Sequence, residues 1–147
     1  MEPLERSETL EEFPGRAALQ QRVLPAYRAP FLDRLALACR DGLEVFAGLP
    51  KPAENVTPAE RLEAARWTRA GNLHFLLTSS PLYFCWQQGL LEWLRQTEPD
   101  VLIVEANPRN ASTRRAVDWM QARSRPVLGW GLGAPPLDGP LSAWGER

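Results

Sequence analysis

Val101-Leu102-Ile103-Val104-Glu105 is a nearly continuous apolar run that ends on a carboxylate and leads into a polar, proline-containing loop. Such a run is typical of a central parallel β-strand that is covered by helices on both faces. Glu98-Pro99-Asp100 breaks the helical pattern before it, and helical spacing resumes from about Ser112 to Arg123. The run therefore predicts one strand of a repeated strand–helix arrangement.

The same alternation extends outward from this strand. We expect further strands at residues 19–24, 43–47, 72–77 and 126–128, and a helix at about residues 30–40. Thr57-Pro58-Ala59-Glu60 is a capping box that predicts a helix ending at Gly71. Another helix is predicted after Ser80-Pro81 by a stripe of apolar side chains at helical spacing, formed by Leu82, Trp86, Leu90, Trp93 and Leu94. The fold class predicted is α/β, a Rossmann-like three-layer domain with a parallel sheet of about five strands.

The chain of 147 residues has the length of one domain. Residues 1–16 are highly charged and show no periodicity, so we expect a disordered tail there. The domain is expected over residues 17–136. Residues 137–147 are interpreted as a truncated linker or tail.

Composition limits the kinds of binding partner and the cellular compartment that we expect for this chain. The 17 basic and 18 acidic residues nearly balance, which gives no reason to expect nucleic acid as a partner. Cys39 and Cys85 lie in apolar runs that are typical of buried, reduced thiols. No signal peptide or membrane span is apparent, so we expect a soluble, cytoplasmic protein without a metal site.

Ligands of an open parallel sheet bind beyond the carboxyl ends of the strands, so the loops that follow the strands are the candidate site. Tyr27 and Arg28 follow the first strand and offer an aromatic face and a cation, which suit a sugar and a phosphate or carboxylate. Packing at the entry of a helix explains the pair equally well. Both interpretations stay open.

The loop after residues 101–105 is the second candidate. Asn107 and Arg109 lead into the N-terminus of a helix, which attracts polar or anionic ligands, although Asn107 is also suited to cap a turn. We favour a ligand role because no cap requires Arg109. Glu105 is able to accept a proton from a ligand hydroxyl, but an ion pair with Arg28 or Arg109 is the favoured interpretation.

Three alternate glycines, Gly129, Gly131 and Gly133, form the third loop, where the backbone is able to approach a ligand closely. Their spacing is not that of a dinucleotide fingerprint. Trp130, between them, is assigned to core packing rather than stacking on a ligand. His74, the single histidine, is assigned to structure. Gln87 and Gln88 are able to reach the crevice from their predicted helix, but a solvated helix face is the favoured interpretation.

Several of these stretches resemble the N-terminal domain of bacterial GT-B glycosyltransferases of the group 1 type. They are residues 22–31 (RVLPAYRAPF), 43–48 (LEVFAG) and 105–109 (EANPR), and Trp119-Met120 and residues 126–133 (PVLGWGLG) extend the likeness. The resemblance covers roughly Leu19 to Pro136. It implies an acceptor-side domain, in which Tyr27, Arg28, Glu105, Asn107, Arg109 and Trp130 line the cleft.

The resemblance also implies a partner domain. In the family, a nucleotide-sugar donor binds mainly to a second, C-terminal Rossmann-like domain, and retaining members carry there two glutamates with seven residues between them. No two glutamates of this chain have that spacing. We therefore expect a domain that holds a glycan or lipid-linked acceptor near a membrane, takes the nucleotide sugar as co-substrate and needs no other cofactor. On its own we expect it to be inactive and, through its uncovered docking surface, to self-associate.

A stand-alone nucleotide- or anion-binding regulatory module of the same fold is the alternative. A truncated product without activity is a further one.

Overall fold

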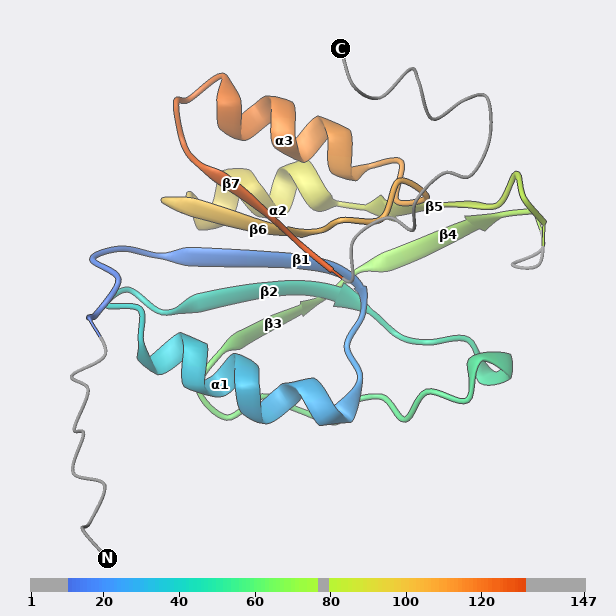
Figure 1. The fold of residues 1–147 in the computed structure, drawn as a ribbon, viewed down its shortest axis with the longest axis horizontal. Coiled ribbons are helices and arrows are strands. Elements are labelled where there is room, and N and C mark those ends of the chain that lie inside the picture. The colour runs from blue at the N-terminus through green and yellow to red at the C-terminus, as the bar shows by residue number, and fades with distance from the viewer. Residues whose placement is uncertain (1–10, 77–79, 132–147) are drawn as a thin grey trace, which may run out of the picture.

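The structure is a computed structural model that describes residues 11–76 and 80–131. Five strands form one sheet in the order β3-β2-β1-β6-β7, and all neighbouring pairs are parallel (Figure 1). Their bounds are β1 Ala17–Val23, β2 Leu43–Gly48, β3 Arg66–Arg69, β6 Val101–Glu105 and β7 Val127–Trp130. The predicted α/β class with a five-stranded parallel sheet is confirmed.

Helices cover both faces of the sheet and give it three layers (Figure 1). Helix α1 (Ala29–Leu37) packs on one face, where Leu19, Leu32 and Val45 share one core. Helices α2 (Leu90–Thr97) and α3 (Thr113–Gln121) cover the other face. The second core includes Phe46 of β2 against Trp93 of α2, with their ring centroids 5.0 Å apart. Strand β1 serves both cores because its successive side chains alternate between the faces.

The predicted helix from Thr57 to Gly71 is wrong. Residues 49–65 contain only a short 3₁₀ helix, η2 (Pro52–Glu54), and otherwise run back along the sheet to β3. The carboxylate of Asp33 on α1 accepts hydrogen bonds from the backbone N–H groups of Glu63, Ala64 and Ala65 at 2.8 to 3.1 Å. These tertiary hydrogen bonds keep the segment after the capping box in a non-helical conformation. The segment then continues into β3, which pairs with β2.

A two-stranded antiparallel hairpin replaces two other predicted elements. Strand β4 (Gly71–Phe75) occupies most of the predicted strand 72–77, but it pairs only with β5 (Phe84–Gln88) and not with the main sheet. The predicted helix after Ser80 is therefore correct only from Leu90 onward. Gly89 adopts a positive φ of 80° between β5 and α2, a conformation that a continuous helix excludes.

Residues 11–16, the described part of the expected tail, contact the domain. Phe13 forms a backbone bridge with Cys39, and the N–H of Arg16 donates to Asp100 Oδ2 at 2.7 Å. Residues 11–16 are thus ordered by the domain, which begins earlier than position 17. Residues 1–10 and 132–147, including Gly133 and the expected linker, lie outside the described residues.

Cys39 and Cys85 are buried free thiols, as expected. Burial raises the pKa of both thiols, so both stay protonated and unreactive at neutral pH. Within residues 11–76 and 80–131, no helix has the length and apolarity needed to cross a membrane.

Candidate functional site

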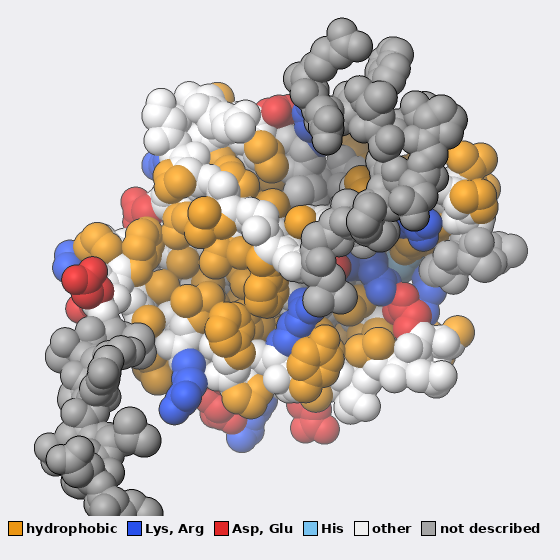
Figure 2. Space-filling model, viewed as in Figure 1, with side chains coloured by type: hydrophobic (Ala, Val, Ile, Leu, Met, Phe, Trp, Pro, Cys, Tyr) orange, Lys and Arg blue, Asp and Glu red, His pale blue; other side chains and the backbone are white. Residues whose placement is uncertain are grey.

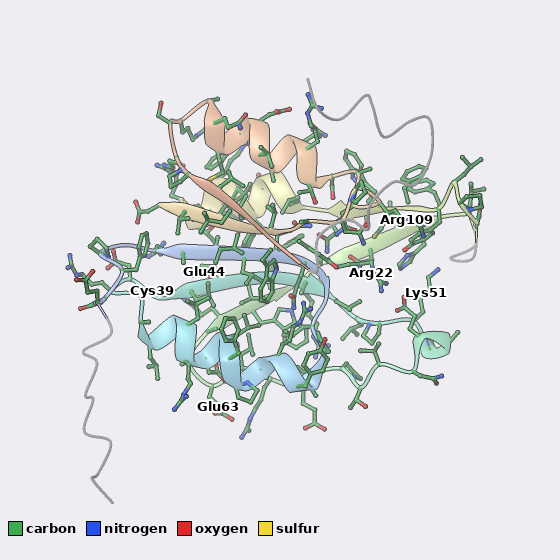
Figure 3. All side chains as sticks on the ribbon, viewed as in Figure 1. Arg22, Cys39, Glu44, Lys51, Glu63 and Arg109 are labelled. Atoms are coloured by element: carbon green, nitrogen blue, oxygen red, sulfur yellow. The ribbon has the colours of Figure 1, made fainter. Side chains whose placement is uncertain are left out.

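The carboxyl ends of β1, β2, β6 and β7 meet at one edge of the sheet, where the hairpin also begins. Figure 3 shows Arg22, Lys51 and Arg109 at this end of the molecule and Cys39 at the opposite end. The short 3₁₀ helix η1 (Ala26–Arg28) leads from β1 into α1 at the same edge. This carboxyl edge is the candidate site, because ligands of parallel sheets bind there.

A buried layer of amides joins the hairpin to the sheet. The Nε2 of Gln20 on β1 donates to the Oε1 of Gln87 on β5 at 2.5 Å. Gln87 Nε2 donates to Asn72 Oδ1 and to the backbone oxygen of Gln21, both at 3.0 Å, and Asn72 Nδ2 donates to the oxygen of Arg22 at 2.7 Å. Gln20 and Gln87 are almost fully buried, so this layer fixes the position of the hairpin.

Glu105 lies at the end of β6, beside this layer. Its Oε2 accepts hydrogen bonds from the backbone N–H of Arg22 at 2.7 Å and from Asn110 Nδ2 at 3.2 Å. The favoured ion pair of Glu105 with Arg28 or Arg109 is not found among the described residues. Glu105 therefore connects two strand ends through neutral donors, and it holds Asn110 at the edge.

Arg22, the next residue of this edge, forms an ion pair. Its guanidinium lies 2.7 Å from Glu54 of η2, and both side chains are about one-fifth exposed, at 18% and 20%. Burial opposes the charged forms, but the hydrogen bond and charge of the partner outweigh it, so the pKa of Arg22 is raised and that of Glu54 is lowered. The pair stays ionised at neutral pH.

Unused hydrogen-bonding groups mark this edge. Five buried side-chain nitrogen or oxygen atoms of the described residues lack a hydrogen-bond partner, and three of them lie here: Gln21 Nε2, Arg22 Nη1 and Asn110 Oδ1. The side chains of Gln21 and Asn110 are 0% and 3% exposed. Because a buried polar group without a partner costs roughly 1–3 kcal/mol, such groups are usually satisfied by water or a ligand.

Tyr27, Arg28 and Trp130 come together at the side of the edge next to α1. The Arg28 guanidinium lies 4.8 Å from the centroid of Trp130 and 5.7 Å from that of Tyr27, and it donates to Gln21 Oε1 at 2.8 Å. Tyr27 is 76% exposed, whereas Trp130 packs against the α1 core and stacks on Phe31. Trp130 thus packs as predicted. Tyr27 supplies an exposed aromatic surface. Arg28 supplies a cation that already donates one hydrogen bond within the chain.

Asn107 and Arg109 have different roles. Asn107 Oδ1 accepts the backbone N–H of Arg109 at 3.0 Å, so Asn107 caps the turn, the interpretation that the sequence analysis disfavoured. Arg109 is exposed, and its side chain makes no ion pair with the described residues. Its backbone oxygen accepts the N–H of Cys85 at 2.8 Å, which ties this loop to the hairpin.

The glycine loop has less steric need for glycine than expected. A Cβ at Gly129 or Gly131 would come no closer than 3.6 Å to its neighbours, and neither residue has a positive φ. Gly48 at the end of β2 is the constrained position, because a Cβ there would collide with the amide of Asn72. Close backbone approach therefore occurs at β2 rather than at the two described glycines of the predicted loop.

His74 and Tyr83 form the outer part of the hairpin junction, with His74 Nδ1 and Tyr83 Oη 2.6 Å apart. Burial, together with the charges of Lys51 and Arg22, lowers the pKa of His74, so the ring is neutral at pH 7. Burial raises the pKa of Tyr83. His74 has the structural role that was assigned to it. No metal-binding group of three or more His, Cys, Asp or Glu side chains occurs in the described parts of the chain.

Sequence reasoning missed Gln20, Gln21, Arg22 and Asn72 as site residues, and for Gln87 it favoured a solvated face over the crevice. The first three were visible as three consecutive polar residues inside a predicted strand, a position where polar side chains need partners. Gln87, assigned to a solvated face, is instead 1% exposed. The alternating burial of Tyr83, Cys85 and Gln87 is the period-2 signal that was hidden by the helical stripe.

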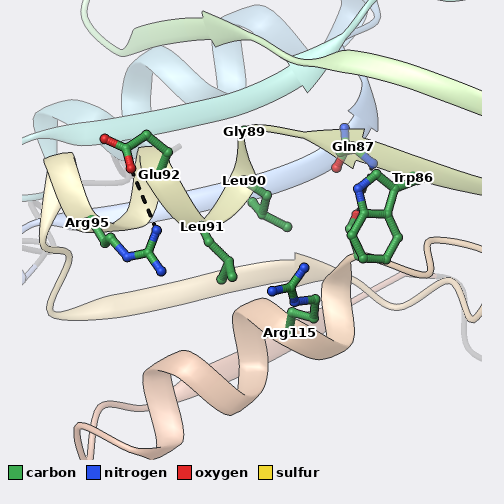
Figure 4. Close-up of a pocket in the computed structure, with 9 residues that line it drawn as sticks. Trp86, Gln87, Gly89, Leu90, Leu91, Glu92, Arg95 and Arg115 are labelled. Carbon is green, nitrogen blue, oxygen red and sulfur yellow. Dashed lines mark hydrogen bonds and ion pairs between the residues drawn. The ribbon is translucent and has the colours of Figure 1, made fainter.

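A pocket of about 250 Å³ opens beside the amide layer, between the N-termini of α2 and α3. Trp86, Leu90, Leu91 and Arg115 contribute to its walls, and Gln87 and Ser112 are shared with the buried layer (Figure 4).

Comparison with protein families, with curated proteins and with solved structures finds no match for this chain.

Proposed function

We propose that this chain is the acceptor-side domain of a GT-B glycosyltransferase that transfers a sugar from a nucleotide-sugar donor to a glycan or lipid-linked acceptor. The observation that carries the proposal is the set of unpartnered buried groups at the carboxyl edge, Gln21 Nε2, Arg22 Nη1 and Asn110 Oδ1. Two donors and one acceptor at one edge suit a ligand rich in hydroxyl groups, because each hydroxyl both donates and accepts.

The surroundings of these groups support a sugar in particular. Tyr27 offers an exposed aromatic ring, a surface on which the apolar face of a sugar stacks. Arg28, next to it, donates to Gln21 and has further N–H groups for a phosphate or carboxylate of the acceptor. Glu105 accepts two hydrogen bonds through Oε2, and among the described residues Oε1 accepts none, which leaves this oxygen to orient an acceptor hydroxyl.

The described domain supplies one wall of a cleft. Transfer of a glycosyl group requires stabilisation of the leaving nucleoside diphosphate and exclusion of water, and both depend on groups that face the acceptor from the other side. The role proposed for Gln21, Arg28, Glu105 and Asn110 is therefore to bind and orient the acceptor. Catalytic residues are assigned to the donor-binding domain.

The proposal is tested by isothermal titration of the chain with short-chain polyprenyl phosphates, glycan fragments, nucleotide sugars and free nucleotides. We expect an acceptor mimic to bind and a Gln21→Met, Arg28→Ala or Asn110→Ala substitution to weaken it about tenfold, since one lost hydrogen bond to a buried group corresponds to about 1.4 kcal/mol. Arg34→Ala is the matched control, because Arg34 is exposed in the second half of α1.

Tight binding of a free nucleotide, abolished by the same substitutions, would instead indicate a nucleotide-binding regulatory module. Binding that Arg28→Ala and Arg34→Ala weaken equally would show that the carboxyl edge is not the site.

A further inference from the structure

The outer face of the β4–β5 hairpin is apolar and exposed. Half of the ten exposed large apolar side chains in the described residues belong to it: Leu73, Phe75, Leu76, Leu82 and Phe84, with exposures from 38% to 73%. Phe75 and Phe84 are cross-strand partners that stack with centroids 4.5 Å apart. The hairpin extends beyond the sheet (Figure 1), and Figure 2 shows some apolar side chains at that end of the molecule, although most of those on this face lie over the sheet and α1. Such a patch marks an interaction surface.

Side-chain chemistry changes in a fixed order along this face. Leu76 and Leu82 flank the turn, the Phe75–Phe84 pair comes next, and the Leu73–Trp86 pair follows nearer the sheet. The guanidinium of Arg115 on α3 lies 5.7 Å from the centroid of Trp86. The aliphatic side chains thus lie farthest from the sheet, the phenyl rings come next, and the indole beside a cation lies nearest to it. This order matches the change in polarity from the interior of a bilayer to its headgroups.

The pocket between α2 and α3 lies at the level of the indole. Trp86 and Arg115 both line it, and Arg115 extends between Leu91 and Trp86 (Figure 4). Arg115 makes no ion pair within the described part of the chain, whereas Arg95 at the other side of the pocket pairs with Glu92 at 3.6 Å. A cation without a partner, next to an apolar face, is complementary to an anionic lipid headgroup.

We propose that the outer face of the β4–β5 hairpin docks this protein on a bilayer containing anionic phospholipid, with Arg115 and the adjacent pocket at the depth of the headgroups. An anionic bilayer supplies an apolar interior and an opposite charge together. A second copy of the chain would instead bring its own Arg115, a like charge, to this face.

Docking of this kind deepens the proposed function. It rests on that function only for the statement that the acceptor is lipid-linked. The N–H of Cys85 donates to the backbone oxygen of Arg109, and the N–H of Ala111 donates to the oxygen of Cys85, which joins the hairpin to the loop after β6. A docked hairpin therefore holds the carboxyl edge near the bilayer surface. An acceptor anchored in that bilayer would reach the site without leaving the bilayer.

Flotation of the full chain with vesicles tests the proposal independently of any sugar acceptor. We expect the chain to float with vesicles of phosphatidylcholine and phosphatidylglycerol, and less with phosphatidylcholine alone. Leu82→Ser should lower the partition coefficient roughly tenfold, since it removes an inserted apolar side chain. Leu37→Ser is the matched control on α1, because Leu37 is 77% exposed and Leu82 is 73% exposed.

The charge is tested with neighbouring arginines. Arg115→Ala should weaken binding to the anionic vesicles about fivefold and leave binding to phosphatidylcholine unchanged. Arg114→Ala should have less effect, because Arg114 lies 3.8 Å from Asp118 and is already partly neutralised.

Absence of flotation of the unmodified chain would overturn the proposal, as would equal losses for Leu82→Ser and Leu37→Ser. Self-association that Leu82→Ser abolishes, without vesicle binding, would assign the face to a second copy. Vesicle binding that persists while the acceptor titration fails would retain this proposal and remove the glycosyltransferase one.

Discussion

The two ends of the parallel sheet differ in how completely their polar groups are paired. At the amino edge, Arg16 donates to Thr97 O at 2.8 Å and to Asp100, and Arg125 donates to Glu98 Oε2 at 2.8 Å. At the carboxyl edge, three buried atoms have no partner. The other two unpartnered atoms are indole nitrogens of Trp93 and Trp119, which lie in the core of α2 and α3. Among the described residues, the amino end of the sheet is therefore completed by pairs within the chain, whereas the carboxyl end keeps buried groups that the chain does not pair.

The carboxyl edge contains two layers with different purposes. Gln20, Gln87 and Asn72 form a satisfied buried layer that holds the hairpin, whereas Gln21, Arg22 and Asn110 each contain a buried atom without a hydrogen-bond partner. Substitutions should therefore separate stability from ligand binding.

The largest effect is expected for Gln87→Ala. The substitution removes the partner of Gln20 Nε2, of Asn72 Oδ1 and of the backbone oxygen of Gln21, so the free energy of unfolding should fall by about 3 kcal/mol in urea denaturation. Gln88→Ala is the control, because Gln88 is exposed on the same strand, and its effect should stay within about 0.5 kcal/mol. Equal losses for the two variants would show that the buried layer does not hold the hairpin.

Asp100→Ala should weaken the amino edge without affecting the site. It removes the acceptor for the N–H of Arg16, so unfolding should require about 1–2 kcal/mol less, while the affinity for an acceptor mimic stays unchanged. Asp118→Ala, which removes a solvent-exposed carboxylate on α3, should change stability by less than about 1 kcal/mol. A loss of ligand affinity in Asp100→Ala would contradict the separation of the two edges.

Substitution of a buried residue usually lowers stability, and Gln21→Met should be an exception. The amide nitrogen of Gln21 is already unpartnered, and the hydrogen bond lost at Oε1 comes from the partly exposed Arg28, which water is able to satisfy instead. The free energy of unfolding should therefore change by less than about 1 kcal/mol, while acceptor affinity falls about tenfold. Gln20→Met is the neighbouring control. It should destabilise by about 2 kcal/mol, because Gln20 is bonded to Gln87 and Thr113.

The smallest effect concerns pH. The folded chain holds the pKa of His74 below its usual 6.5, so the unfolded chain takes up this proton first and stability falls as the pH drops below about 6.5. Denaturation midpoints measured between about pH 5 and pH 8 should decline toward acid, and His74→Gln should flatten that decline. Since His74 is the only histidine, an unchanged profile in the variant would show that the decline has another source.

Parts of the fold were accessible from sequence because they depend on local pattern. Val101–Glu105 was predicted with its observed bounds, and Leu43–Gly48 to within one residue, because a short apolar run between turn residues has few other structures. The site was only partly accessible. Arg28 and Trp130 were identified as loop residues, but their contact with each other depends on the neighbouring ends of separate strands.

The failures share a physical cause. Thr57 to Gly71 carries a good helix start, yet Asp33, about thirty residues earlier, binds the backbone N–H groups of residues 63–65. Local propensity contributes only tenths of a kcal/mol per residue, which tertiary hydrogen bonds and strand pairing exceed. Leu82 and Trp86 fit both a helical and a strand period, and the strand period prevails because Tyr83, Cys85 and Gln87 are buried by partners from other elements.

By itself the sequence determined the layered α/β class and four of the five parallel strands, because periodicity and the chirality of strand–helix–strand units specify these features. Only the tertiary structure decided that a hairpin replaces a helix, that Gln87 is buried and that Gln21 and Asn110 lack partners. Whether a polar group is satisfied depends on atoms that are distant in the chain, and no local pattern contains that information.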